Sequence, residues 1–311
     1  MRCLPIEERF AHVPFARREG FKILTALEAR VDESLTQREI AAAADLSVGT
    51  VNRAMADLHE RGFVREGMLS AAGLEALEPY RVKRAVLIAA GFGSRLVPIT
   101  LNTPKPLIRV QGQRIIDSLL DAVFAAGIEE VYVVRGYLAE QFDQLLYKYP
   151  HVKFIENPFY NEANNISSAV AAKDLLQNAY VFESDLLLYN PKLITKYQYS
   201  SNYLGVPVPV TDDWCFQTRR GVITGLTVGG TDCHHMFGIS YWTEEDGRKL
   251  ADDVPATFAM PGGKERYWDE VALRYFARNY EVSVRECTFD DVIEIDTYRE
   301  LQQLDKSYVV G

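Results

Sequence analysis

The sequence has few cysteines, no long apolar run and no excess of positive charge. Its four cysteines, Cys3, Cys215, Cys233 and Cys287, include no Cys-x-x-Cys pair, which is typical of free thiols in a reducing cytoplasm. No apolar run approaches the roughly 18 residues that a membrane span requires, and the charged segment 1–10 lacks the apolar stretch of a secretion signal. The net charge of −9 argues against nucleic acid as the main substrate. We therefore expect a cytoplasmic protein with no membrane partner.

Residues 1–82 have the pattern of a small winged helix-turn-helix domain. Thr36 and Glu39 form a capping box at the start of an alanine-rich helix, and a second helix is predicted over about 48–61. A short hairpin is predicted over 62–69, and the order of helix, helix-turn-helix and hairpin is that of a winged helix. The boundary with the second domain is expected at the charged stretch just before residue 83.

The charge of this first domain bears on what it binds. In a winged helix the second helix of the turn enters the DNA major groove. Residues 1–80, however, hold thirteen acidic and ten basic side chains, whereas DNA-binding modules are normally basic. DNA is therefore one candidate partner, and a role in packing, dimerisation or regulation is the alternative.

From residue 83 to 311, short apolar strands alternate with amphipathic helices. This alternation predicts a three-layer α/β/α domain whose mixed, mainly parallel sheet is covered by helices on both faces. The strands are predicted at 85–90, 131–134, 152–155, 179–182 and 292–295, and helices are predicted at 115–124, 139–147 and 166–176. In such sheets ligands bind beyond the carboxyl ends of the strands. Gly91, Gly136 and Asp185 each stand at or just beyond such an end, so we expect the site there.

The stretch 91–107 carries the strongest functional signal. Gly91 and Gly93 follow a buried strand, and a glycine turn can present successive N–H groups to an anion. Lys105 adds a cation on a segment stiffened by a proline on either side. The stretch is not a Walker A loop, because no Gly-Lys-Ser/Thr follows, and it lacks the third glycine of a dinucleotide fingerprint. It predicts a phosphate-binding loop of another class.

Two aspartates and two asparagines stand at further ends of elements. Asp185 and Asp296 each follow an apolar strand, and Mg²⁺ is usually held by one or two carboxylates together with substrate phosphates. Each aspartate could instead cap a helix, but with the glycine loop we expect both to bind Mg²⁺. Asn164 and Asn165 can read a base or ribose edge, or one of them can cap the following helix.

The loop pattern resembles a known signature. Leu-Ile-Ala-Ala-Gly-Phe-Gly-Ser-Arg-Leu, followed by Thr-Pro-Lys-Pro-Leu, resembles nucleotidyltransferases that load a phosphorylated small molecule onto a nucleotide. The segments at 134–138, 157–168, 183–185, 213–214, 238–242, 267–269 and 293–296 are similar to the bacterial phosphocholine cytidylyltransferases. That family transfers CMP from CTP to phosphocholine with Mg²⁺, giving CDP-choline. Two features depart from it: the winged-helix segment, and Glu183 and Ser184 where aspartate and alanine are usual.

The resemblance, which covers roughly residues 84–306, implies roles for named residues. Arg95 and Lys105 would act on the CTP phosphates, and Asp185 and Asp296 would be catalytic as metal ligands. The expected nucleotide-binding residues are Ala89, Ala90, Gly91, Phe92, Gly93, Ser94, Arg95, Lys105, Gly136, Tyr137, Asn164, Asn165, Ser168, Glu183 and Ser184. CTP and phosphocholine are thus the expected partners, and the sequence does not fix the oligomeric state.

Three aromatic residues and one acid supply the parts of a choline site. Trp214, Tyr267 and Trp268 can offer faces to a quaternary ammonium group, and Asp269 can add countercharge. Trp268 also fits a helical apolar stripe, so it could belong to the core instead.

Other functions fit parts of the same pattern. Hexose-1-phosphate nucleotidylyltransferases share the loop but usually carry a Glu-Lys-Pro triplet, which this chain lacks. A 2-aminoethylphosphonate cytidylyltransferase is a nearer alternative, because its substrate is also a small zwitterion. A transcription regulator that uses the second domain as a ligand sensor would not need Lys105, Asp185 and Asp296.

Overall fold

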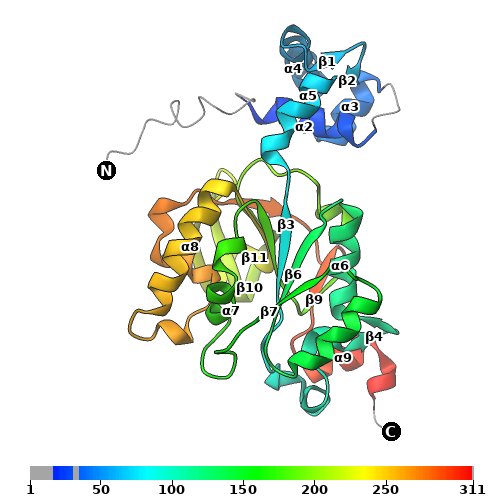
Figure 1. Ribbon diagram of the computed structural model, residues 1–311. Coiled ribbons are helices and arrows are strands. Elements are labelled where there is room, and N and C mark those ends of the chain that lie inside the picture. The colour runs from blue at the N-terminus through cyan, green and yellow to red at the C-terminus, as the bar shows by residue number, and fades with distance from the viewer. Residues whose placement is uncertain (1–16, 31–34, 310–311) are drawn as a thin grey trace. The chain divides into compact units, whose positions relative to one another are not determined.

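Residues 17–30 and 35–309 are described by the computed structural model of this protein (Figure 1). The chain divides into two units, Met1–Arg81 and Val82–Gly311. Within the described residues no helix is long and apolar enough to cross a membrane.

The first unit is a winged helix-turn-helix, as the sequence predicts. Its elements are α2 (Arg18–Glu28), α3 (Gln37–Ala44), α4 (Val48–Glu60), β1 (Val64–Arg65), β2 (Met68–Leu69) and α5 (Ala71–Leu77). The predicted capping box is present, because Glu39 N–H donates to Thr36 Oγ1 and Thr36 N–H donates to Glu39 Oε2. Leu24, Val51 and Leu77 are fully buried and lie on three different helices, so they form its core.

The second unit is built on a mixed sheet of seven strands. In spatial order these are β10 (Asn202–Arg219), β12 (Ser283–Glu286), β11 (Val222–Trp242), β8 (Ala179–Glu183), β3 (Arg84–Ile88), β6 (Glu130–Arg135) and β7 (Lys153–Glu156). β8, β3, β6 and β7 are parallel to one another, whereas β11 runs antiparallel to β8. This confirms the predicted mixed, mainly parallel sheet.

Helices cover both faces of the sheet, which gives the predicted three layers (Figure 1). Alternate residues of β3 point to opposite faces. Ala85 and Leu87 pack in one core with α6 (Ile115–Ala125), and Val86 packs in the other with α7 (Ile166–Ala171) and α8 (Glu244–Phe258). The central strand is therefore apolar on both sides, as buried parallel strands usually are.

Three segments differ from the pattern expected of them. The segment Ala139–Tyr147 is helical but of the 3₁₀ type. The helix predicted over 166–176 ends at Ala171 and continues as a short 3₁₀ turn. The long hairpin β10–β11 has no clear signal in the sequence, because β10 contains two prolines and its pairing shifts register between Thr211 and Trp214. Such interruptions hide the two-residue alternation of a strand.

A second, two-stranded sheet brings the end of the chain to the site. β9 (Leu186–Leu188) pairs antiparallel with β13 (Val292–Glu294), and Ile295 N–H donates to the Asp185 carbonyl oxygen at 3.1 Å. Helix α9 (Tyr298–Leu304) follows and begins with a capping box. This pairing places Asp296 beside Asp185, although 111 positions separate them in the sequence.

Candidate active site

The loop after β3 wraps around Lys105. Gly93 has a φ of 67°, in the left-handed region that favours glycine, and a Cβ there would lie 3.1 Å from Lys105 Cβ. Its carbonyl oxygen accepts hydrogen bonds from Leu96 N–H and from Thr100 Oγ1, both at 3.0 Å. The positive φ and the close approach of the Lys105 side chain both require glycine at position 93. The turn in this way packs directly against the aliphatic part of Lys105.

Lys105 joins the two predicted metal ligands. Its Nζ lies 2.8 Å from Asp185 Oδ2 and 2.9 Å from Asp296 Oδ1. Arg95 pairs with Asp296 through both terminal nitrogens, at 2.7 and 2.8 Å. Burial by itself would lower the pKa of Lys105, but the charges of Asp185 and Asp296 outweigh burial and raise that pKa above its ordinary value. The lysine therefore remains a cation in a nearly buried position.

Three carboxylates form a cluster that could hold a metal ion. One oxygen each of Glu183, Asp185 and Glu294 lies within 4.8 Å of the others. Burial raises the pKa of Glu183 and of Glu294 well above the ordinary value for glutamate, and neighbouring carboxylates add to that rise. Asp185 Oδ1 and Ser184 Oγ are buried without a hydrogen-bond partner in the described structure. Oxygen ligands gathered around an unpaired carboxylate oxygen suit Mg²⁺.

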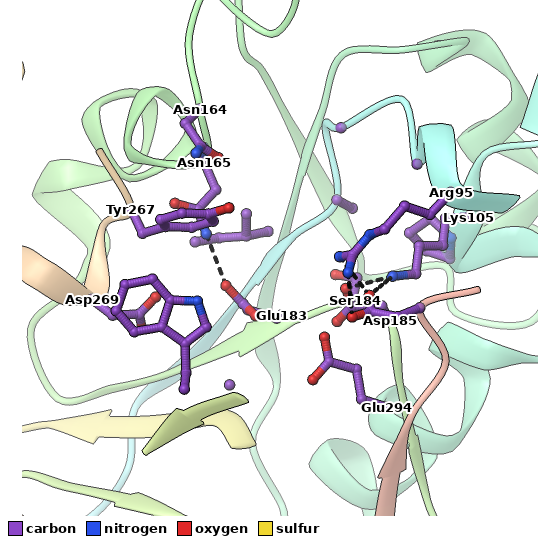
Figure 2. A pocket seen from close by; sticks show the side chains of 18 of the residues that line it. Arg95, Lys105, Asn164, Asn165, Glu183, Ser184, Asp185, Tyr267, Asp269 and Glu294 are labelled. Carbon is purple, nitrogen blue, oxygen red and sulfur yellow. Dashed lines mark hydrogen bonds and ion pairs between the residues drawn. The ribbon is translucent and has the colours of Figure 1, made fainter. Parts of the chain in front are cut away.

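The two asparagines hold the cleft wall together. Asn165 Nδ2 donates to Glu183 Oε1 at 2.8 Å (Figure 2), and its Oδ1 accepts from Trp268 N–H at 2.9 Å. Asn164 Oδ1 accepts from the N–H of Asn165 at 2.8 Å. Both side chains line the cleft, but the Asn165 amide already uses its oxygen and one N–H within the protein.

Aromatic side chains form one wall. Trp214 and Tyr267 line the cleft with ring centroids 5.5 Å apart in an edge-to-face arrangement. Trp268 differs from the expectation that it belongs to a choline site. It is 2% exposed and packs edge-on against Trp242 and at a tilt against Tyr203, so its ring lies in the core instead of the cleft. The helical spacing of apolar residues after it reflects this burial.

Asp269 is a buried acid on the same wall. It is 4% exposed and accepts a hydrogen bond from Tyr203 Oη at 2.7 Å. Burial raises its pKa to about 7, although the Tyr203 hydrogen bond opposes that rise. Near neutral pH it therefore changes between neutral and charged forms.

Comparison with known proteins identifies both units. Residues 84–202 match the family described as nucleotidyl transferase, and residues 20–65 match winged helix-turn-helix DNA-binding. A 2-aminoethylphosphonate cytidylyltransferase of Lancefieldella rimae is 36% identical over 229 residues, which cover 72% of this chain and 93% of that protein. A choline-phosphate cytidylyltransferase of Streptococcus pneumoniae is 28% identical, over 72% of this chain and 99% of that protein. The chain is a cytidylyltransferase of the nucleotidyltransferase family.

A solved structure agrees with this assignment. The CTP:phosphocholine cytidylyltransferase of Streptococcus pneumoniae superposes with a TM-score of 0.67 at 28% identity, covering 74% of this chain and all of that one. The nucleotidyltransferase fold predicted from the loop signature is thereby confirmed.

Most of the predicted residues lie around one cleft in this cytidylyltransferase. Those that line it are Ala89, Gly91, Gly93, Ser94, Arg95, Lys105, Asn164, Asn165, Glu183, Ser184, Asp185, Trp214, Tyr267, Asp269 and Asp296. The glycine loop, the two strand ends and the aromatic wall therefore face a common space, which Figure 2 shows with Glu183 between Asp269 on one side and Asp185 on the other.

Five predicted nucleotide contacts lie outside the cleft lining, as does Trp268, which was predicted for the choline site. Ala90, Phe92, Gly136, Tyr137 and Ser168 are not among the residues lining the cleft. Phe92 packs edge-to-face on Tyr137 at 4.7 Å, and Tyr137 N–H donates to the Ala90 carbonyl oxygen. Gly136 lies against the Tyr160 ring, and Ser168 Oγ accepts from Asn157 at 3.0 Å. These residues support the loops that form the cleft.

The sequence interpretation also missed residues that line the cleft. They are Ile88, Pro106, Asp213, Leu226, Met236, Gly238 and Glu294. Glu294 could have been found, because it stands two residues before Asp296 just as Glu183 stands two residues before Asp185. In extended chain, residues two apart point to the same side. Leu226, Met236 and Gly238 come from the long hairpin that the sequence pattern did not reveal.

Proposed function

We propose that this cytidylyltransferase transfers CMP from CTP to a small zwitterion that has a phosphonate or phosphate at one end and an ammonium group at the other. The charge of the cleft carries this proposal. Among the described lining residues, six side chains are carboxylates and two, Arg95 and Lys105, are cations. Such a cleft would repel a triphosphate unless cations enter with the substrates. A metal ion and a cationic acceptor would supply them.

The residues present fit Mg²⁺ at one end of the cleft. Asp185 and Asp296 are the residues that would hold it, with Glu294 of the carboxylate cluster close by, and the buried, unpaired Asp185 Oδ1 supports that assignment. Glu183, the third carboxylate of that cluster, already accepts a hydrogen bond from Asn165. When bound, Mg²⁺ would offset negative charge on the phosphates of the nucleotide and so favour departure of pyrophosphate.

The reaction needs no protein nucleophile. An oxygen of the acceptor's phosphonate or phosphate attacks the α-phosphorus of CTP. A new P–O bond forms as the bond to the oxygen between the α and β phosphorus atoms breaks, and pyrophosphate leaves. Arg95, Lys105 and the N–H groups of the loop at 91–94 would hold the charged phosphates in line. The attacking oxygen is already largely anionic near neutral pH.

2-Aminoethylphosphonate is the first candidate acceptor. The relative that is 36% identical acts on it, and the carboxylates of Glu183, Asp213 and Asp269 offer acceptors to its N–H groups. Phosphocholine is the second candidate, favoured by Trp214 and Tyr267, which line the cleft, since aromatic faces attract a quaternary ammonium. The burial of Trp268 removes one face from that site and shifts our preference to the primary amine.

Pyrophosphate release with CTP and Mg²⁺ tests the proposal. The acceptors to compare are 2-aminoethylphosphonate, phosphoethanolamine, phosphocholine and glucose 1-phosphate. We expect the highest kcat/KM with 2-aminoethylphosphonate and almost none with glucose 1-phosphate, which has no cation. A preference for glucose 1-phosphate would contradict the proposal, and a preference for phosphocholine would make the second candidate the substrate.

The winged helix-turn-helix gives a second partner to test. We propose that α4 contacts DNA, because the unit matches a DNA-binding family and α4 exposes Asn52 and Arg53. Fluorescence anisotropy with a mixed-sequence duplex at low salt should show binding that Arg53→Ala weakens. Loss of a phosphate contact would also reduce the salt dependence. Absence of binding at low salt would assign the unit another role.

A further inference from the structure

Glu183 is a cleft carboxylate without a cationic partner. Asp185 and Asp296 pair with Lys105 and Arg95, as described above. In the part of the chain that the structure describes, the Glu183 side chain has one hydrogen bond, from Asn165 Nδ2, and no ion pair. Asp269, a second carboxylate, lines the same cleft. A half-buried and a buried carboxylate, neither with a cationic hydrogen-bond partner, suit a cationic ligand.

The Glu183 side chain is held in place on two sides. Because the Trp268 N–H can only donate, Asn165 must turn its Oδ1 toward Trp268 and its Nδ2 toward Glu183. On the other side, Gly238 of β11 leaves room for it: a Cβ there would lie 2.6 Å from Glu183 Cγ and 2.7 Å from Oε2. The carboxylate is therefore fixed, with Oε1 bound to Asn165.

Asn165 also links this carboxylate to the aromatic wall. The backbone N–H that it binds belongs to Trp268, between Tyr267 and Asp269. Figure 2 shows Asn165, Tyr267 and Asp269 on one side of the cleft, Arg95, Lys105 and Asp185 on the other, and Glu183 between them. Glu183 therefore stands between the aromatic wall and the carboxylate cluster beside Asp185, to which it also belongs.

We propose that Glu183, together with Asp269, binds the ammonium group of the acceptor and selects a primary over a quaternary amine, with Asn165 as a positioning residue. The inference rests on the proposed function, since it requires an acceptor with an ammonium group. A primary ammonium donates charge-assisted hydrogen bonds to a carboxylate, typically at about 2.7–2.9 Å. A trimethylammonium has no N–H to donate, so it gains much less from Glu183.

The test compares two acceptors that differ only in their methyl groups, 2-aminoethylphosphonate and its N,N,N-trimethyl form, on the full-length protein. Glu183→Gln should lower kcat/KM for the primary amine about 10- to 100-fold, mainly through KM, because it removes one charge-assisted hydrogen bond. The change for the trimethyl form should be about threefold or less by the same reasoning. The KM for CTP and the affinity for Mn²⁺ in the presence of CTP, measured by electron paramagnetic resonance, should stay unchanged.

Glu294→Gln is the matched control, because Glu294 is a carboxylate of the same cleft that belongs to the cluster beside Asp185. It should weaken Mn²⁺ binding and reduce turnover of both acceptors equally. Asn165→Ala should shift the ratio of the two acceptors in the same direction as Glu183→Gln, to a smaller extent, with Mn²⁺ affinity retained. A general loss of structure would lower kcat/KM for both acceptors alike and would leave the ratio of the two values unchanged. Glu183→Asp, which keeps the charge but shortens the side chain, gives a second variant should Glu183→Gln not fold.

Three results would overturn the inference. Equal loss for both acceptors together with weaker Mn²⁺ binding in Glu183→Gln would make Glu183 a metal ligand. An unchanged acceptor ratio in Glu183→Gln, or in Glu183→Asp if only that variant folds, would exclude a role in selection. If the wild type released pyrophosphate with neither ammonium compound but did so with glucose 1-phosphate, the proposed function itself would fail.

Discussion

At the scale of single residues, the cleft is defined by carboxylates that differ in their partners. Asp185 and Asp296 are neutralised by Lys105 and Arg95, whereas Glu183 and Asp269 are bound to the neutral groups of Asn165 and Tyr203. Carboxylates can therefore serve both ends of the cleft, the one that binds phosphates and the one that binds the ammonium group. Variants of the two sets should fail in different ways.

Asp185→Asn and Asp296→Asn should each reduce turnover on the order of 100-fold or more while the fold survives. Each change removes a negative ligand from the metal site, and metal charge stabilisation of a phosphoryl transition state is worth several kcal/mol. Steady-state pyrophosphate release with Mg²⁺, beside a thermal melt, measures both effects. Asp143→Asn, at an exposed ion pair with Arg135, is the control and should remain near the wild-type rate. Near wild-type rates for both site variants would show that neither residue holds the metal.

The buried Asp269 predicts a pH-dependent stability. Its pKa is raised to about 7 by burial, while Tyr203 opposes the rise and the nearby acid Glu270 adds to it. The folded state therefore binds this proton more tightly than the unfolded state does. The resulting stabilisation is complete below the ordinary pKa of 3.8 and is lost as pH rises to about 7.

Asp269→Asn keeps an acceptor for Tyr203 but removes the titration. Its unfolding free energy should exceed that of the wild type by an amount that grows between pH 5 and 7, by about 2 kcal/mol, and then levels off. Denaturant unfolding followed by tryptophan fluorescence checks this, because all three tryptophans lie in the second unit. A difference that is independent of pH, or largest at low pH, would rule out the raised pKa.

At the scale of elements, the phosphate loop depends on one left-handed glycine. Gly93→Ala combines an unfavourable φ with a Cβ 3.1 Å from Lys105 Cβ, so it should destabilise the protein by about 1–2 kcal/mol and raise the KM for CTP. Gly112→Ala is the matched control, since Gly112 has a φ of 89° but nothing within 4 Å of its Cβ position. The melting temperature measures the loss of stability, and steady-state kinetics measure the KM for CTP, in each of the two variants. If both variants kept the wild-type KM, the loop would not hold the nucleotide.

The elements also show how far sequence reasoning reaches. The β3 strand, its glycine turn and α6 follow from local apolar pattern and turn chemistry, and they were predicted within one or two residues. The place of Asp296 beside Asp185 depends on the β9–β13 pairing across more than a hundred residues, which local pattern does not contain. A shared metal site was nevertheless expected, because each aspartate follows an apolar strand and a glycine loop lies nearby, and the family resemblance agreed with it. Trp268 was expected in a choline site, with the core as the alternative, and core packing against Trp242 and Tyr203 decides its position.

At the scale of the whole molecule, every cleft residue belongs to the second unit. A protein that begins near Val82 should therefore keep CTP turnover within about twofold of the full chain, because rates change little when no group of the site is removed. Parallel assays of the two forms with the same acceptor measure this. A truncated form that is folded but inactive would show that the winged helix-turn-helix completes the site.

The central claim, CMP transfer to an ammonium-bearing phosphonate or phosphate, is tested most directly by identifying the product formed with the first candidate acceptor. The full-length protein is incubated with CTP, Mg²⁺ and 2-aminoethylphosphonate and followed by ³¹P nuclear magnetic resonance. We predict that the phosphonate signal is replaced by a coupled pair from a new P–O–P linkage, while one equivalent of pyrophosphate appears. If the phosphonate signal persists unchanged while glucose 1-phosphate under the same conditions gives a nucleotide sugar, the account is contradicted.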